Sequence, residues 1–213
     1  MAGVPEIRLF LADDALSVWR ATEEALELDG APIPFWAFAW AGGLALARYL
    51  LDHPDVVRGR YVLDFATGSG LVAIAAARAG AGRVAAADTD PFAEAAVQAN
   101  ARANAVRLDF VGRDLLADEQ PDVDVVLAAD TWYEQPMADR VTPWLRQAAA
   151  HGVRVLVADP GRRHFPADTF VRLAAYDVET TTALEDRPVV RSSVYTFDAS
   201  DDDRAANTAS QWP

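Results

Sequence analysis

The chain has 213 residues, 52% of them hydrophobic, which suits one globular domain with a full apolar core. Its formal net charge of −13, without any cluster of five or more basic residues, argues against nucleic acid as a partner; it either favours a basic partner or only aids solubility. Because it has no cysteine, no metal-binding histidine spacing, no apolar window long enough for a membrane helix and no recognisable secretory signal, we expect a soluble cytoplasmic protein that binds neither metal nor membrane.

The first 33 residues read as an extension ahead of the main domain. Residues 7–11 predict a short apolar strand or arm, and a helix follows that Asp13 and Asp14 can cap. A Gly-Ala-Pro-Ile-Pro segment then breaks the chain. We therefore place an N-terminal extension at residues 1–33 and the main domain at residues 34–198.

Helices and strands alternate through the main domain. Helices are expected at residues 44–51, 71–79, 91–104 and 137–150, and strands at residues 61–65, 84–87, 108–111, 123–129 and 153–158. Residues 167–174 predict a short helix, and residues 176–182 and 192–197 a closing antiparallel pair. This order predicts an α/β fold with a Rossmann-like, doubly wound sheet of seven strands, mostly parallel, with an antiparallel C-terminal pair. Residues 199–213 read as an acidic, disordered tail.

The strongest sign of a ligand is Val-Leu-Asp-Phe-Ala-Thr-Gly-Ser-Gly at residues 62–70, followed by an alanine-rich helix. Gly68 and Gly70 let the backbone approach a ligand closely, and the helix N-terminus offers free N–H groups to an anion. The segment lacks both the third glycine of a dinucleotide motif and the Gly-Lys-Ser/Thr end of a P-loop. We take Asp64, Thr67, Gly68 and Gly70 as candidate cofactor-binding residues, with an ordinary tight turn as the alternative.

An acidic residue follows at the distance expected for ribose recognition. Asp88 ends the second strand about 20 residues beyond the glycine loop, where a carboxylate can accept hydrogen bonds from both ribose hydroxyls. Thr89 beside it is a further candidate contact, and Asp90 is expected mainly as the N-cap of the next helix. A plain loop carboxylate is the alternative for Asp88.

The ends of the third and fourth strands supply further candidates. Asp114 could accept a hydrogen bond from an adenine amino group while Leu115 or Leu116 packs on the ring. Ala129, which ends the fourth strand, is a candidate cofactor contact. Because ligands of such sheets bind outside the carboxyl ends of the strands, Asp130 and Tyr133 fall at the reaction centre as candidate catalytic residues. The alternative is a helix cap with aromatic packing.

Four large rings, those of Phe35, Trp36, Phe38 and Trp40, lie within six residues. Core packing is the default for such rings, and attraction to a cationic sulfonium or ammonium is the alternative. Trp40 is the best candidate among them for a cofactor contact. Beyond the fifth strand, Arg162 could contact substrate or lie in a solvated loop.

Together these motifs resemble the seven-β-strand methyltransferases that use S-adenosylmethionine, and within them the lysine methyltransferases that modify the β-subunit of electron-transfer flavoprotein. The resemblance spans roughly residues 5–197. It rests on the segments at residues 34–43, 62–70, 88–91 (Asp-Thr-Asp-Pro), 130–133 (Asp-Thr-Trp-Tyr) and 159–162 (Asp-Pro-Gly-Arg). The superfamily usually has glycine at the position of Ala66 and often leucine or isoleucine at that of Phe65; alanine fits there if its φ is negative.

The resemblance implies methyl transfer from S-adenosylmethionine, with S-adenosylhomocysteine as the product, to a lysine of a protein such as the flavoprotein β-subunit. Asp130 would orient the amine, and Tyr133 and Trp132 would shape the slot around it. The amine must be neutral although free lysine titrates near about 10.4, so a desolvated aromatic slot helps because it lowers that pKa, whereas a carboxylate raises it. No metal is required.

Other functions stay open on the sequence alone. A methyltransferase for a small, nicotinamide-like amine would use the same aromatic slot. A protein that binds the cofactor without catalysis would keep the glycine loop, although Asp130 and Tyr133 count against it. A nicotinamide-dependent dehydrogenase is disfavoured by the absent third glycine and by the terminal strand pair.

Overall fold

The computed structural model describes residues 3–12, 17, 34–117, 120–180 and 187–197. The cap expected at Asp13 and Asp14, most of the helix after it and the tail at residues 199–213 lie outside the described residues. The limits placed on the extension, the main domain and the tail therefore stay predictions.

A seven-stranded sheet forms the centre of the fold, in the order β3-β2-β1-β4-β5-β7-β6. Its strands are β1 (Tyr61–Phe65), β2 (Arg83–Ala87), β3 (Asp109–Val111), β4 (Val125–Ala129), β5 (Arg154–Asp159), β6 (Phe170–Glu179) and β7 (Val189–Phe197). The first five strands are parallel, and β7 runs antiparallel to both β5 and β6. This confirms the predicted doubly wound sheet and its antiparallel end.

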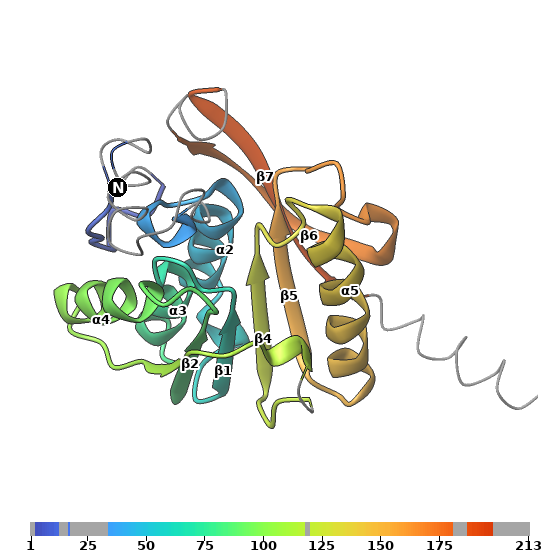
Figure 1. The fold of residues 1–213 in the computed structure, drawn as a ribbon, viewed down its shortest axis with the longest axis horizontal. Coiled ribbons are helices and arrows are strands. Elements are labelled where there is room, and N and C mark those ends of the chain that lie inside the picture. The colour runs from blue at the N-terminus through green and yellow to red at the C-terminus, as the bar shows by residue number, and fades with distance from the viewer. Residues whose placement is uncertain (1–2, 13–16, 18–33, 118–119, 181–186, 198–213) are drawn as a thin grey trace, which may run out of the picture.

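Helices cover both faces of the sheet, with α2, α3 and α4 on one side and α5 on the other (Figure 1). The helices are α2 (Ala41–Asp52), α3 (Leu71–Arg78), α4 (Ala93–Ala103) and α5 (Gln135–Ala150), and short 3-10 turns are η1 (Phe35–Ala37), η2 (Pro54–Val56), η3 (Leu115–Ala117) and η4 (Ala167–Thr169). Since both faces are covered, the parallel strands are mostly apolar; apart from Asp64 in β1, their charged residues stand at strand ends. In β1, Val62 packs with α2 and α3, whereas Leu63 and Phe65 pack with α5.

The helix expected at residues 167–174 is wrong. Only η4 is helical there, and β6 begins at Phe170, which pairs with Phe197 of β7. The alanine and leucine content favours a helix locally, but pairing along the whole length of β7 supplies backbone hydrogen bonds that override this preference.

The N-terminal residues 3–12 form an arm, not a strand, against α4. Asn104 accepts the N–H of Arg8 at 2.9 Å and Asn100 accepts that of Phe10 at 2.7 Å. The side chains of Val4 and Ile7 are buried. The arm is therefore held by buried asparagine side chains and not by the sheet.

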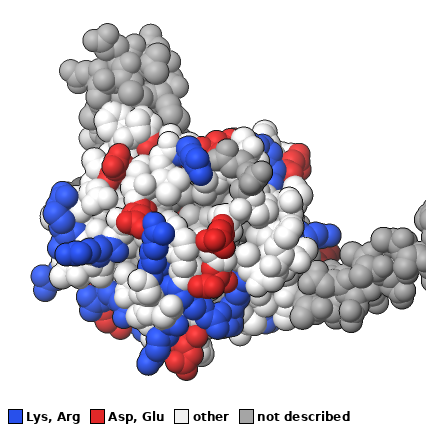
Figure 2. Space-filling model, turned by 90° about the horizontal axis from the view of Figure 1, so that it is seen from below, with Lys and Arg blue, Asp and Glu red and all other residues white. Residues whose placement is uncertain are grey.

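The surface carries both signs of charge. On the face shown in Figure 2, arginine and acidic side chains are interspersed and do not gather into an area of one sign. Within the described ranges, no helix combines the length and hydropathy needed to cross a bilayer. The same ranges hold no group of three or more acidic or histidine side chains placed to bind a metal ion.

Candidate active site

A cavity of about 410 Å³, a size that suits a small-molecule ligand, opens at the carboxyl ends of the parallel strands. It brings together the predicted residues Trp40, Asp64, Thr67, Gly68, Asp88, Thr89, Asp114, Leu115, Ala129, Asp130 and Tyr133. Gly70 is the exception, because it does not line the cavity. It precedes α3 with a φ of +82°, and a Cβ there would lie 3.3 Å from Cγ2 of Val97 in α4.

The loop between β1 and α3 turns through three residues with positive φ: Ala66 at 53°, Gly68 at 52° and Gly70 at 82°. The negative φ under which alanine would fit at Ala66 without strain is therefore not present. This conformation is unfavourable by about 1–2 kcal/mol for a residue with a Cβ. The turn imposes it, because the chain must reverse from the end of the strand into the helix while Gly68 passes under the backbone of Phe35, whose oxygen would lie 3.6 Å from an added Cβ.

Asp64 ties this loop to α3 from inside the protein. Its Oδ2 accepts hydrogen bonds from the Thr67 hydroxyl at 2.5 Å and from the N–H of Ala73 at 2.9 Å. Burial raises the pKa of Asp64 to about 7, although these two hydrogen bonds act in the opposite direction. The carboxyl group thus fixes the loop and lines the cavity at once.

Asp88 joins the end of β2 to the same loop. Its Oδ2 accepts the N–H of Gly68 at 2.8 Å, and its Oδ1 accepts the N–H of Asp90 at 3.0 Å. Asp90 in turn accepts the N–H of Phe92 at 2.8 Å, but α4 begins only at Ala93. Pro91 and Phe92 form a turn ahead of the helix, and the side chain of Asp90 closes that turn. The prediction that Asp90 is the N-cap of α4 is therefore wrong, because Phe92 holds that position.

Asp114 and Leu115, which follow β3, line the cavity as well. Asp114 accepts hydrogen bonds from Nη2 of Arg140 in α5 at 2.6 Å and from the N–H of Leu116 at 3.0 Å. The hydrogen bond from Arg140 lowers the pKa of Asp114. Leu115 is buried in η3, so its side chain offers an apolar surface to the cavity.

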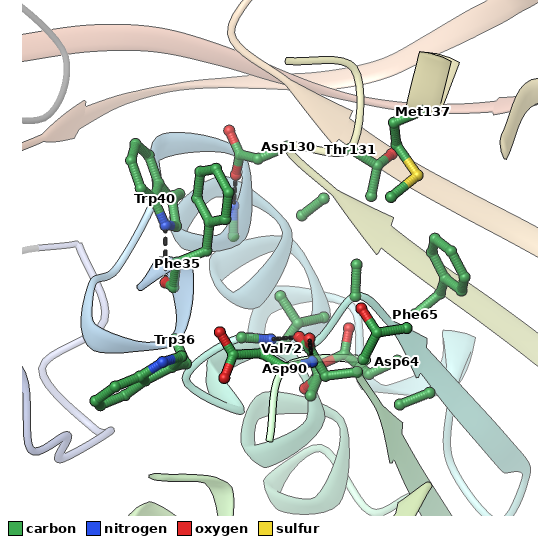
Figure 3. A pocket seen from close by; sticks show the side chains of 18 of the residues that line it. Phe35, Trp36, Trp40, Asp64, Phe65, Val72, Asp90, Asp130, Thr131 and Met137 are labelled. Atoms are coloured by element: carbon green, nitrogen blue, oxygen red, sulfur yellow. Dashed lines mark hydrogen bonds between the residues drawn. The ribbon is translucent and has the colours of Figure 1, made fainter. Parts of the chain in front are cut away.

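Aromatic rings form one end of the cavity, where Figure 3 shows Phe35 and Trp40 beside Asp130. The ring centroid of Phe35 lies 5.6 Å from that of Trp40 and 4.9 Å from that of Tyr133. Nε1 of Trp40 donates to the carbonyl oxygen of Phe35 at 3.0 Å, which fixes the indole. We call the space lined by Phe35, Trp40 and Tyr133 the aromatic slot.

Asp130 lies at this end in a left-handed conformation, with φ at 57°. Its Oδ2 accepts the N–H of Gly43 in the first turn of α2 at 2.8 Å, and its Oδ1 accepts Nη2 of Arg162 at 3.0 Å. Burial raises the pKa of Asp130, while Arg162 and the N–H groups of Gly43 and Gly42 oppose the rise. The carboxyl group of Asp130 is thus held by the N-terminus of a helix and by a guanidinium, both of which favour its ionised form.

Trp132 does not shape the slot, contrary to expectation. It is fully buried on the α5 side, where Nε1 donates to the hydroxyl of Thr142 at 2.9 Å and the ring packs edge-on against Phe165 and Phe170. The left-handed turn at Asp130 redirects the chain, so that Trp132 enters the core while Tyr133 stays 40% exposed.

Arg162 and Trp36 line the cavity as well, although the sequence did not single out either as a cofactor-binding or catalytic residue. The sequence left open whether Arg162 contacts a ligand or solvent, and its ion pair with Asp130 resolves this in favour of the cavity. Trp36 belongs to the aromatic segment, and its indole Nε1 is buried without a hydrogen-bond partner among the described residues. The density of rings at residues 35–40 was the signal that pointed to it.

Comparison with known proteins finds relatives that are all named as methyltransferases. A family model for the ribosomal protein L11 methyltransferases (PrmA) matches residues 46–129. The electron transfer flavoprotein beta subunit lysine methyltransferase of Xenopus laevis is 38% identical over 200 residues, covering 91% of this chain and 80% of that protein. Its namesake from Homo sapiens is 36% identical over 199 residues, covering 91% and 75%.

A solved structure shares the fold. Magnesium protoporphyrin IX methyltransferase from Synechocystis PCC 6803, which contains bound S-adenosylmethionine, matches with a TM-score of 0.55 at 16% identity and covers 87% of this chain and 92% of that one. At this level of identity the match extends to the architecture of the sheet and its helices.

Proposed function

This chain belongs to the family of electron-transfer flavoprotein β-subunit lysine methyltransferases and is an S-adenosylmethionine-dependent protein-lysine methyltransferase, and we propose that it methylates the β-subunit of an electron-transfer flavoprotein. One observation carries the proposal for the site: a single cavity joins the glycine loop to the aromatic slot that ends at Asp130. The first half suits a nucleoside cofactor, and the second suits a narrow aliphatic amine.

The residues at the glycine-loop half fit the cofactor. The carboxylate of Asp88 would accept hydrogen bonds from the ribose hydroxyls, and the backbone at Gly68 leaves room for the methionine portion. Asp114 and Leu115 would receive the adenine. Nε1 of Trp36 is a buried donor on the cavity wall that finds no acceptor among the residues that the structure describes, and such a donor is normally satisfied by a ligand or water.

When bound, S-adenosylmethionine supplies an electrophilic methyl group on a sulfonium. The lysine nitrogen would attack that carbon as the carbon–sulfur bond breaks, and the proton of the amine would leave to water. Phe35, Trp40 and Tyr133 would align the lysine and exclude water, since positioning supplies most of the rate of such a displacement. Asp130 would orient the nitrogen from the end of the slot.

Charge favours a basic protein surface around the target lysine. The chain carries a formal net charge of −13, so its field attracts a lysine-bearing partner over long distances. Tyr133 lies at the rim, and Glu134 follows it in an exposed position. A protein partner would therefore meet an aromatic rim with an exposed glutamate beside it.

Methyl transfer to purified electron-transfer flavoprotein tests the proposal. Labelled S-adenosylmethionine is supplied, and labelled residues are located by peptide mapping. The sequence of the enzyme contains no lysine, so the enzyme cannot methylate a lysine of its own. Any label found on the enzyme therefore measures the background of the assay. We expect label on lysines of the β-subunit. Label confined to lysines of another protein in a lysate would overturn the substrate, and label confined to small molecules would overturn the acceptor class.

A variant pair tests the role of Asp130 in the same assay. We expect Asp130→Ala to lose transfer while it still binds S-adenosylhomocysteine. Asp109→Ala is the matched control, because Asp109 is an exposed aspartate that pairs with Arg83 at the far end of the strands. Near-normal kcat in Asp130→Ala would show that the orienting role is wrong.

We also propose that the protein works in the cytoplasm. A chain without cysteine gains nothing from an oxidising compartment. Fractionation of the source cells followed by immunodetection should find it in the cytosolic fraction. Recovery in an organelle or membrane fraction would contradict this location.

A further inference from the structure

Arg162 lies in the wall of the cavity between two buried acids. Its Nη2 is 3.0 Å from Oδ1 of Asp130, and its backbone N–H donates to Oδ1 of Asp159 at 2.6 Å. The guanidinium carbon is 5.8 Å from the ring centroid of Trp40. The side chain of Arg162 is 21% exposed and that of Asp130 is 10% exposed, so the ion pair is largely shielded from solvent.

Hydrogen bonds from backbone N–H groups hold the chain on both sides of the ion pair between Arg162 and Asp130. Asp159 accepts the N–H groups of Gly161 at 2.7 Å and of Arg162 at 2.6 Å, which folds the Asp-Pro-Gly-Arg turn after β5. On the other side, the N–H of Gly43 holds Asp130. The guanidinium is therefore built into the site, whereas its neighbour Arg163 is exposed.

We propose that Arg162 is a positioning residue whose guanidinium neutralises the Asp130 carboxylate and so keeps the incoming lysine side chain in its uncharged, nucleophilic form. This inference rests on the proposed entry of the lysine along the aromatic slot toward Asp130. A lone buried carboxylate at that point would stabilise an ammonium ion, which has no lone pair with which to attack. A guanidinium stays protonated at any working pH, so it cancels this field permanently.

The charged and titratable groups around the slot come from several elements. They are Asp130 and Tyr133 after β4, Asp159 and Arg162 after β5, and Asp88 and Glu134, whose charges act on Tyr133. From α2, the first turn presents the backbone N–H groups of Gly42 and Gly43. Removal of Arg162 takes the positive charge away from Asp130 and makes this end of the cavity more negative, which favours a protonated amine.

The pH dependence of kcat tests the proposal, measured with saturating flavoprotein and cofactor from about pH 6.5 to about pH 9.5. We expect kcat to rise with pH on the acidic limb of the profile, as the amine loses its proton. Arg162→Gln should move this limb to higher pH by about one unit, because the fraction of neutral amine at a given pH falls tenfold. Arg162→Lys keeps the charge and should keep the limb near that of the wild type. A uniform loss of kcat at every pH in Arg162→Gln would overturn the proposal, because a structural role predicts that result.

Two further variants keep the test decisive. Arg163→Gln is the matched control and should leave the profile unchanged. If Arg162→Gln fails to fold, Arg162→Met takes its place, because it also removes the charge but keeps an unbranched side chain; its acidic limb should move upward in the same way, and a folded Arg162→Met with the wild-type limb would overturn the proposal. Wild-type enzyme that labels no lysine refutes the proposed substrate, whereas active wild type with an unshifted Arg162→Gln profile refutes only the role of Arg162.

Discussion

The N–H of Gly43 donates a hydrogen bond of 2.8 Å to Oδ2 of Asp130, and this contact joins the first turn of α2 to the end of β4. The helix begins without a side-chain cap of its own, so the carboxylate from the neighbouring strand takes that role. The same oxygen lies so close to Gly42 that a Cβ on Gly42 would be 2.5 Å away. The candidate catalytic acid and the start of α2 are therefore one structural unit.

Two adjacent glycines should respond in opposite ways to alanine. In Gly42→Ala the new methyl group would meet Oδ2 of Asp130 at 2.5 Å and the carbonyl oxygen of Ala158 at 2.7 Å, so we expect a loss of about 1–3 kcal/mol in the free energy of unfolding. In Gly43→Ala the methyl group would lie 3.7 Å from Leu71, an ordinary contact, and alanine favours the helix by up to about 1 kcal/mol. Urea unfolding of both variants checks this, and equal destabilisation would contradict it.

Replacing Ala66 by glycine should stabilise the protein. Ala66 has a φ of 53°, which glycine adopts without the steric cost that a Cβ brings. After the greater entropy of an unfolded glycine is subtracted, we expect a rise in Tm of about 2 °C for a chain of this size.

Two other alanines provide the controls for this measurement. Ala105, with a φ of 54°, lies outside the cavity lining and should show the same rise on change to glycine. Ala95, exposed within α4, should show a fall instead. If Ala66→Gly and Ala95→Gly both lower Tm, the backbone strain assigned to Ala66 does not exist.

The sequence predicted the elements whose signals are local. The apolar run that ends at Phe65, the glycine loop and the acid at Asp88 sit where expected, because a parallel strand and its following turn are specified by neighbouring residues. What it did not predict depends on distant partners. Residues 170–174 join a strand because β7 pairs with them.

The sequence did not predict the orientation of the side chains after β4 either. Trp132 and Tyr133 are adjacent, and only the left-handed φ of Asp130 decides which of them faces the cavity. Similarly, the sequence could not place Arg162, because its partner lies 32 positions earlier in the chain. Such contacts follow from the packing of loops and not from any local pattern.

Cofactor binding should depend on Asp88. The carboxylate accepts the N–H of Gly68 at 2.8 Å, so Asp88→Ala removes the proposed ribose acceptor and also frees the glycine loop. We expect the Kd for S-adenosylhomocysteine to rise at least about tenfold, which corresponds to about 1.4 kcal/mol. Isothermal titration calorimetry measures it, with Asp109→Ala as the exposed control. An unchanged Kd in Asp88→Ala would remove this residue from the cofactor site.

Asp159 should make stability depend on pH. It is buried, with a pKa raised to about 7 chiefly by desolvation, while the ordinary value is 3.8. A raised native pKa means that the folded protein retains a proton that the unfolded chain has already released. The stabilising contribution is therefore fully present below about pH 4 and is lost as the pH rises toward 7.

Substitution of Asp159 by asparagine isolates this contribution. Asp159→Asn keeps an oxygen that can accept the N–H groups of Gly161 and Arg162 but cannot ionise. We expect its free energy of unfolding to exceed that of the wild type by a margin that grows between about pH 4.5 and about pH 7 and then levels off. Urea unfolding across this range measures the margin, and Asp168→Asn, at an exposed position, should show none. A margin that stays constant with pH would mean that Asp159 is ionised throughout, held charged by the two N–H groups and by Arg162.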